Sequence, residues 1–194
     1  MEIHITPSYW NNRYLEENTT WDLGQVSPPL KNYIDQLEDK NISILIPGCG
    51  NAYEAQYLAE KGFTNVHLLD ISLYLIEKIR PKFQDSSSVS IHYQDFFDHE
   101  RTYDLILEQT FFCAIHPSLR TNYVKKMYAL LQPKGKLVGV LFDRYFTSNP
   151  PFGGSEAEYE SLFKNHFGFH TLEKCYNSIP PRAGSELFIN FTKK

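Results

Sequence analysis

The sequence predicts an α/β fold with a doubly wound, mostly parallel sheet. Three observations support it: apolar stretches of strand length alternate with amphipathic helical patterns, a glycine turn follows the first apolar stretch, and the second apolar stretch ends in a carboxylate. The 194 residues are enough for one such core and too few for a separate substrate domain. We therefore expect one domain over 1–194, with an N-terminal lid and helix in 1–40 and the core in 41–194.

The stretch 42–72 carries the strongest signal. It reads as a strand, a turn containing Gly48 and Gly50, a helix, and a second strand ending at Asp70. Glycine lets the backbone bend sharply and approach a ligand, and the helix that follows presents free N–H groups to the same place. An acid at the end of the next strand is typical of the carboxylate that binds ribose hydroxyls in a Rossmann-like fold. These residues predict a nucleoside-binding half-domain.

Tyr53 indicates which nucleoside is bound. A dinucleotide site has a third glycine at this position, where the helix start lies beside the pyrophosphate. A bulky tyrosine disfavours that arrangement and favours a smaller nucleoside with an amino-acid tail, such as S-adenosylmethionine. Asp70 disfavours the alternative, a turn that binds nothing.

The alternation of helices and strands continues after residue 72. The two late strands are joined through a turn with Pro180 and Pro181, which indicates an antiparallel C-terminal edge on an otherwise parallel sheet of seven strands. Beyond the two strands of 42–72, apolar spacing predicts helices over 73–83, 118–131 and 156–166, and strands over 89–93, 103–108, 136–142, 169–176 and 185–192.

Composition excludes several classes of partner. A net charge of −4 gives no basic face for a phosphate backbone, so we expect no nucleic-acid partner. No apolar run approaches the length of a membrane span, and the first ten residues lack a signal peptide. The cysteines, Cys49, Cys113 and Cys175, are odd in number and lack metal-ligand spacing, so we expect reduced thiols, no metal and a cytoplasmic location.

An aromatic string precedes the first strand. Trp10, Tyr14 and Trp21 fall on one helical face if the helix persists, and the residues between them are mostly polar. One reading is an apolar face docked on the sheet. The other, which we favour, is a helical lid over the cofactor, because aromatic faces attract a sulfonium cation.

A series of short motifs runs along most of the chain: Trp10, Tyr14 and Trp21-Asp22-Leu23-Gly24, then LIPGCG (45–50), LLDIS (68–72), QDFF (94–97), YDLILEQTFFCAIHPSLR (103–120), LLQPKGKLV (130–138) and RAGSE (182–186). On these motifs the chain resembles the class I S-adenosylmethionine-dependent methyltransferases, in the thiopurine methyltransferase-like branch that includes thiol and halide methyltransferases. In two positions the chain departs from the branch: Tyr14 replaces a second Trp, and Glu108-Gln109 replace Asp-Tyr.

The resemblance implies S-adenosyl-L-methionine as cofactor and a small-molecule methyl acceptor. Gly48 would face the methionine tail, Asp70 the ribose, Ile71 the adenine ring, and Asp95 the adenine amino group, with Phe96 packing on the ring. For Asp95 the alternative is a helix N-cap or turn residue. The full set of expected cofactor-binding residues is Trp10, Tyr14, Trp21, Gly48, Gly50, Asp70, Ile71, Asp95, Phe96 and Gln109.

We expect methyl transfer to a thiol, thiopurine or halide by in-line displacement. These soft nucleophiles need no strong general base, because a thiol is already partly ionised at neutral pH. His116 and Glu108 are the nearest candidates for a base, Arg144 and Arg182 are possible anion contacts, and Cys113 is expected to be buried. The alternatives are an oxygen- or nitrogen-methyltransferase, a catalytically silent cofactor-binding module and, least favoured, a nicotinamide oxidoreductase.

Overall fold

A computed structural model describes residues 5–194. Residues 1–4, which belong to the expected segment 1–40 and to the stretch expected to lack a signal peptide, lie outside the described residues. Within 5–194, no helix combines the length and the apolar character needed to cross a membrane.

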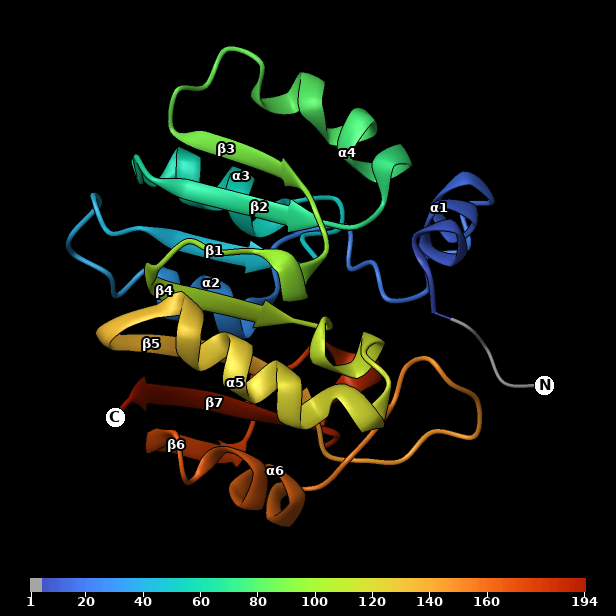
Figure 1. The fold of residues 1–194 in the computed structure, drawn as a ribbon, viewed down its shortest axis with the longest axis vertical. Helices are drawn as coiled ribbons and strands as arrows, with labels where there is room; N and C mark the ends of the chain where they lie inside the picture. The colour runs from blue at the N-terminus through green and yellow to red at the C-terminus, as the bar shows by residue number, and fades with distance from the viewer. Residues whose placement is uncertain (1–4) are drawn as a thin grey trace.

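Seven strands form one sheet in the order β3-β2-β1-β4-β5-β7-β6 (Figure 1). Only β7 runs against its neighbours, and β6 beyond it forms the edge. The predicted mostly parallel sheet with an antiparallel pair at its C-terminal side is therefore confirmed. The strands are β1 (Ile44–Pro47), β2 (Val66–Asp70), β3 (Val89–Tyr93), β4 (Tyr103–Gln109), β5 (Leu131–Phe142), β6 (Phe167–Lys174) and β7 (Glu186–Lys193).

The strand order reverses at β1, which pairs with β2 on one side and with β4 on the other. In open α/β sheets ligands bind outside the carboxyl ends of the strands at such a reversal. Figure 1 shows that α1 (Pro7–Leu15) and the loop after β5 both lie at this end of the sheet. The fold thus brings the N-terminal aromatic residues to the predicted binding edge.

Helices cover both faces of the sheet. One core contains buried residues of α2 (Pro28–Ile34), α3 (Tyr53–Glu60) and α4 (Leu73–Ile79), and the other contains those of α5 (Arg120–Leu130) and α6 (Glu156–Phe163). Short 3₁₀ turns complete the connections: η1 (Arg80–Phe83), η2 (Phe96–Asp98), η3 (Phe112–Ala114), η4 (Pro117–Leu119) and η5 (Pro180–Arg182).

Local residues explain where the helices begin. The Ser72 hydroxyl accepts a hydrogen bond from the Leu75 N–H and so caps α4, and Ser155 caps α6 in the same way through the N–H of Glu158. At α1, the Thr6 side chain accepts from the N–H of Tyr9, while Pro7 occupies the first turn, where its missing N–H is not needed.

Some predicted boundaries were displaced. The α-helix expected over 73–83 ends at Ile79 and continues as η1, because Pro81 cannot extend the α-helical hydrogen bonding. The helix expected over 118–131 begins at Arg120, and β5 already starts at Leu131, with a register shift against β4 before residue 136. These shifts leave the order of elements unchanged.

Candidate active site

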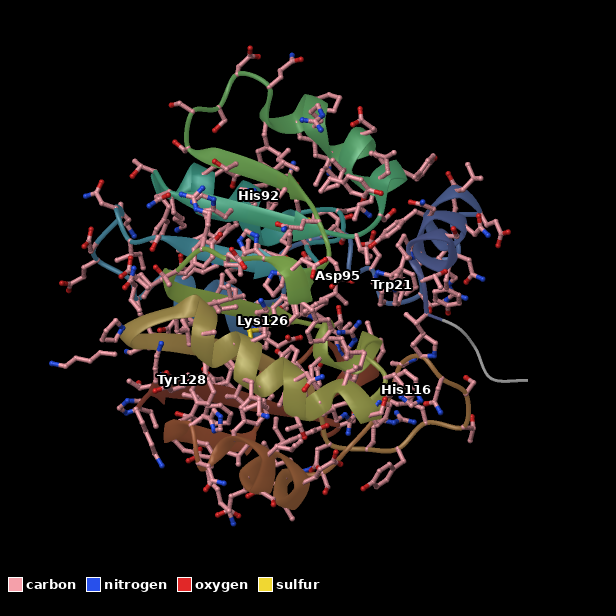
Figure 2. The ribbon with its side chains drawn as sticks, viewed as in Figure 1. Trp21, His92, Asp95, His116, Lys126 and Tyr128 are labelled. Carbon is pink, nitrogen blue, oxygen red and sulfur yellow. The ribbon has the colours of Figure 1, made fainter. Side chains whose placement is uncertain are left out.

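A cavity of about 800 Å³ opens at the carboxyl ends of the parallel strands. Figure 2 labels Trp21, Asp95 and His116, which come from three distant segments and lie on the side of the molecule where α1 and the loop after β5 are found. All ten residues expected to bind cofactor line it: Trp10, Tyr14, Trp21, Gly48, Gly50, Asp70, Ile71, Asp95, Phe96 and Gln109.

The glycine turn after β1 is shaped by its neighbours as well as by its backbone. Gly48 and Gly50 adopt φ of 58° and 53°, in the left-handed region that side chains disfavour. A Cβ at Gly48 would lie 2.4 Å from Cδ2 of Phe111, so the ring of the β4 loop packs directly on this turn. A Cβ at Gly50 would lie 3.7 Å from the Tyr14 hydroxyl of α1. The turn therefore lies between Phe111, in the loop after β4, and Tyr14 of α1.

Asp70 ends β2 in a nearly dry position. Its Oδ1 accepts a hydrogen bond of 2.9 Å from the Ser72 N–H, and the side chain is buried. Burial raises the pKa of this carboxyl to about 6, because water no longer solvates the charge well. Such a carboxylate at the cavity wall can accept hydrogen bonds from a diol.

Asp95 has the turn-forming role that was the alternative expectation. Its Oδ1 accepts a hydrogen bond of 2.8 Å from the Phe97 N–H and caps η2. The residue also lines the cavity, so capping and a ligand contact are compatible. The Phe96 ring packs edge-on against Phe111 at 5.0 Å between ring centroids and is almost fully buried.

Glu108 and Gln109, the last two residues of β4, point their side chains in opposite directions. Gln109 lines the cavity, and its buried Oε1 has no hydrogen-bond partner among residues 5–194. Glu108 faces away: its Oε1 accepts from the N–H groups of Phe111 and Phe112 at 2.8 and 2.9 Å, and its Oε2 from the Tyr123 hydroxyl at 2.5 Å. Burial raises the Glu108 pKa to about 7. Glu108 therefore holds the loop after β4 and does not reach the cavity as a base.

Trp10, Tyr14 and Trp21 contact one another, but not through the single helical face that was expected. The helix ends at Leu15, so the interpretation of a single helical face through Trp21 was wrong. The chain turns back instead, and the Trp21 ring contacts Trp10 and Tyr14 edge-on at 5.6 and 5.8 Å. The Arg182 guanidinium donates a hydrogen bond of 2.8 Å to the Trp21 carbonyl. The segment is thus tied to the loop between β6 and β7.

Arg13 is a cavity residue that the sequence analysis missed. Its guanidinium carbon lies 5.3 Å from the Trp21 ring centroid, and its buried Nε has no hydrogen-bond partner among the described residues. A cation between Trp10 and Tyr14 was the available signal, because residues three and four apart share a helix face.

The other end of the cavity is mainly apolar. Phe142 ends β5, and its ring packs edge-on against Phe146 at 4.9 Å. Cys113 is buried as expected, and its thiol donates to the Thr110 carbonyl at 3.2 Å. His116 is exposed at the rim, where its Nδ1 contacts the Ser118 hydroxyl at 2.8 Å. This end offers rings and thiol packing, with no buried base among its described residues.

Comparisons with known proteins identify the family of the chain. Residues 5–187 match the family described as Thiopurine S-methyltransferase (TPMT). The chain is 32% identical to "Probable thiol methyltransferase 2" of Arabidopsis thaliana (91% of this chain, 81% of that protein) and 30% identical to "Thiocyanate methyltransferase 1" of the same plant, with the same coverage. A solved structure of 1,6-didemethyltoxoflavin-N1-methyltransferase from Burkholderia thailandensis shares the fold, with a TM-score of 0.79 and 18% identity over 98% of this chain and 88% of that one.

The fold and the cavity define a Rossmann-like S-adenosylmethionine-dependent methyltransferase, as the sequence predicted. Within that class, the chain belongs to the thiopurine S-methyltransferase family. S-Adenosyl-L-methionine is accordingly its cofactor. The residues fit this group. Gln109, Arg13 and Asp70 line one cavity, and among residues 5–194 the buried Gln109 Oε1 and Arg13 Nε have no hydrogen-bond partner, so an acceptor and a donor are left for a ligand beside the Asp70 carboxyl.

Proposed function

We propose that the protein transfers the methyl group of S-adenosylmethionine to a small soft nucleophile, a thiol, thiopurine or halide, without an enzymic general base. One observation carries the proposal. Among the described residues that line the cavity, His116 is the only imidazole, and it lies exposed at the rim, while Glu108 is turned into the core. A nucleophile that is already anionic needs neither group.

We place the cofactor along the wall formed by β1, β2 and β3. Asp70 would accept from the ribose hydroxyls, Asp95 from the adenine amino group, and Ile71 and Phe96 would pack on the ring. Gly48 and Gly50 would face the methionine tail under α1. Arg13 would bind the tail carboxylate, because its guanidinium lies beside Trp21 in the same cavity and its Nε has no hydrogen-bond partner among residues 5–194.

The chemistry follows from charge. When bound, S-adenosylmethionine supplies an electrophilic methyl group on a sulfonium. A thiolate or halide that approaches it loses charge toward the transition state, so a cavity wall of Phe111, Phe142 and Phe146 suits the reaction better than water does. The remaining contribution of the protein is to hold the two reactants in line.

The acceptor class is tested with two nucleophiles that differ in their protons. At subsaturating thiol the rate should rise with pH toward the free thiol pKa, whereas with iodide it should stay nearly flat. His116→Ala should leave both profiles intact. A steep pH dependence with iodide that disappears in His116→Ala would contradict base-free transfer and favour oxygen or nitrogen methylation. Tight binding of S-adenosylhomocysteine with no turnover on any acceptor would indicate a silent cofactor-binding module.

We further propose that the segment around Trp10, Tyr14 and Trp21 orders on the cofactor as a lid. Both tryptophans of the chain lie there, so cofactor should shift indole fluorescence and protect amides of residues 9–24 from exchange. Trp21→Ala should weaken cofactor binding more than it lowers the melting temperature of the ligand-free protein. If cofactor changes neither signal, the segment is a static part of the fold.

We also propose that residues 1–194 form a single methyltransferase domain, that the protein is cytoplasmic, and that it has no nucleic-acid partner. All three cysteines are buried and unpaired, as expected for a reducing compartment. The net charge of −4 disfavours a polyanion. Fractionation and a nucleic-acid binding assay at low salt test these two statements.

A further inference from the structure

The acceptor end of the cavity contains two arginines, and only one of their guanidinium groups has polar partners among residues 5–194. The Arg182 guanidinium is paired: its Nη1 lies 3.3 Å from the Glu186 carboxylate, and its Nη2 donates to the Trp21 carbonyl. Arg144 lines the same cavity, yet its guanidinium forms no ion pair and no hydrogen bond within the part of the chain that the structure describes. The acid next to it in sequence, Asp143, pairs with Lys174 instead. Arg144 is therefore a cation without a counterion.

The backbone of Arg144 is held firmly although its side chain is exposed. Its carbonyl accepts a hydrogen bond of 3.0 Å from the Gly154 N–H. A Cβ at Gly153 would lie 1.8 Å from the same carbonyl oxygen, so the chain packs there at a distance that only glycine allows. On the preceding side, the Tyr159 hydroxyl donates to the Phe142 carbonyl at 2.6 Å.

The Arg144 side chain is also supported. Its guanidinium carbon lies 4.8 Å from the centroid of the Phe146 ring, which packs against Phe142. Stacking on an aromatic face orients the planar guanidinium and leaves its N–H groups available at the edge. The positive charge of Arg144 thus lies at the cavity wall beside the Phe142 and Phe146 rings.

The position of Arg144 separates it from the cofactor. It follows β5, which lies two places from β1 in the sheet, about 10 Å away at the usual strand spacing. The proposed function puts the cofactor tail under α1, where Arg13 lies beside Trp21. An anion at Arg144 would therefore belong to the acceptor, on the far side of its reacting atom.

We propose that Arg144 selects acceptors that carry an anionic group, such as a carboxylate, apart from the atom that receives the methyl group. This inference rests on the proposed function, because it assigns the acceptor class of the same cavity. The guanidinium binds the carboxylate through charge-assisted hydrogen bonds, Phe146 and Phe142 contact the body of the acceptor, and the sulfur points toward the cofactor.

The test compares two thiols of similar shape, para-mercaptobenzoate and the neutral para-thiocresol. Arg144→Gln should lower kcat/KM for para-mercaptobenzoate about ten- to a hundredfold, mainly through KM, and change it less than about threefold for para-thiocresol. Each variant is compared with wild type on the same thiol, so that the different thiol pKa values cancel. Arg144→Lys should fall between, because an ammonium keeps the charge and loses the planar fork. Arg80→Gln, at an exposed arginine paired with Glu77, is the matched control.

Calorimetry supplies a readout that does not depend on turnover. Para-(methylsulfanyl)benzoate should bind the S-adenosylhomocysteine complex of wild type and lose the same factor in Arg144→Gln. Equal losses for both thiols, or no loss for either, would overturn the inference and leave the proposed function standing. Turnover of iodide with neither thiol methylated would overturn this inference alone. A wild-type protein that binds S-adenosylhomocysteine yet methylates no thiol, thiopurine or halide would overturn the proposed function and this inference with it.

Discussion

The glycine turn and the strand-terminal acid of the proposed cofactor side lie in residues 46–71, one continuous stretch, whereas the proposed acceptor side is assembled from loops between residues 110 and 185. The first is a strand, a glycine turn, a helix and a strand-terminal acid, all fixed by neighbours in sequence. The second depends on contacts such as the hydrogen bond from the Phe152 N–H to the Cys113 carbonyl. The centre of the proposed cofactor side is therefore positioned by local structure, and the proposed acceptor side by tertiary packing.

The largest effect should follow from removing Arg182, which connects the Trp21 segment to Glu186 of β7. Arg182→Ala leaves the buried Glu186 carboxylate unpaired and removes the donor to Trp21. We expect the free energy of unfolding to fall by about 3–5 kcal/mol, measured by urea denaturation. The double variant Arg182→Ala/Glu186→Gln should recover a large part of this loss. If it recovers nothing, the arginine acts through packing and not through its charge.

The second prediction concerns Gly48, where the glycine turn on the cofactor side packs against Phe111 on the acceptor side. Gly48→Ala adds left-handed strain and a contact of 2.4 Å, so unfolding free energy should fall by about 2–4 kcal/mol. Gly62→Ala is the matched control, because Gly62 has φ of 84° and nothing within 4 Å of its missing Cβ. It should show only the strain, about 1 kcal/mol. Equal losses would mean that Phe111 moves aside freely.

Asp70 tests the cofactor side alone, and two effects of opposite sign are expected. Asp70→Asn should weaken cofactor binding by about 1.5–3 kcal/mol in calorimetry, because charge-assisted hydrogen bonds to the ribose are lost. It should also stabilise the ligand-free protein at pH 7, because burial raises the Asp70 pKa to about 6 and so disfavours the charged form in the fold.

The sign of the pH dependence follows from the same shift. Between the unfolded pKa of about 4 and the folded value of about 6, the native state binds more protons than the unfolded state, so wild-type stability falls as pH rises through this window. Asp70→Asn should remove that fall in ligand-free melting curves. An unchanged dissociation constant together with unchanged pH dependence would place the nucleoside elsewhere.

The smallest effect is expected behind the cofactor side, where three histidines gather on β2, β3 and the loop before β4. His67 contacts His92 between ring nitrogens at 3.1 Å, and His99 contacts the Tyr103 hydroxyl at 2.7 Å. Burial lowers the pKa of His67 and His99 to about 4, with the Arg101 charge adding to the effect. Figure 2 places His92 in this region, and Lys126 donates a hydrogen bond to the His99 carbonyl.

These histidines should make the protein less stable in acid. Since the unfolded chain binds protons near pH 6.5 and the fold does so only near 4, the stability present above pH 6.5 is lost as pH falls toward 4. Removing one titrating group with His99→Gln should lessen that loss by about 1 kcal/mol, as measured by melting at stepped pH. His170→Gln, at an exposed histidine on β6, is the control and should keep the wild-type profile.

The sequence predicted positions at the cavity where local structure decides them. Gly48, Gly50 and Asp70 were expected there from spacing alone, because a strand, turn and helix place them whatever the rest of the chain does. Trp21 was placed at the cavity for the wrong reason, since its helix had ended and tertiary contacts returned it. Glu108 shows the opposite error: adjacent strand residues face opposite sides, and only the fold shows that Gln109 has the open side.

The acceptor side was not predictable in the same way. Arg144 and Arg182 both looked like loop cations in the sequence. Which one is neutralised depends on Glu186 of β7 and on Lys174 of β6, whose pairing with Asp143 leaves Arg144 alone. Spacing does not show that Arg144 is left alone, because Asp143 and Lys174 lie 31 positions apart along the chain and meet only when the sheet is complete.

The position of β7 has a consequence for how the protein is made. Residues 186–193 leave the ribosome after β6, yet they lie between β5 and β6. A nascent chain that has already formed β5 therefore waits with one side of that strand unpaired, and β6 has no neighbour at all until its successor arrives. Assembly of this sheet thus waits for its last strand in sequence, and a chain that stops before residue 186 would leave one side of β5 and both sides of β6 unpaired and prone to aggregation.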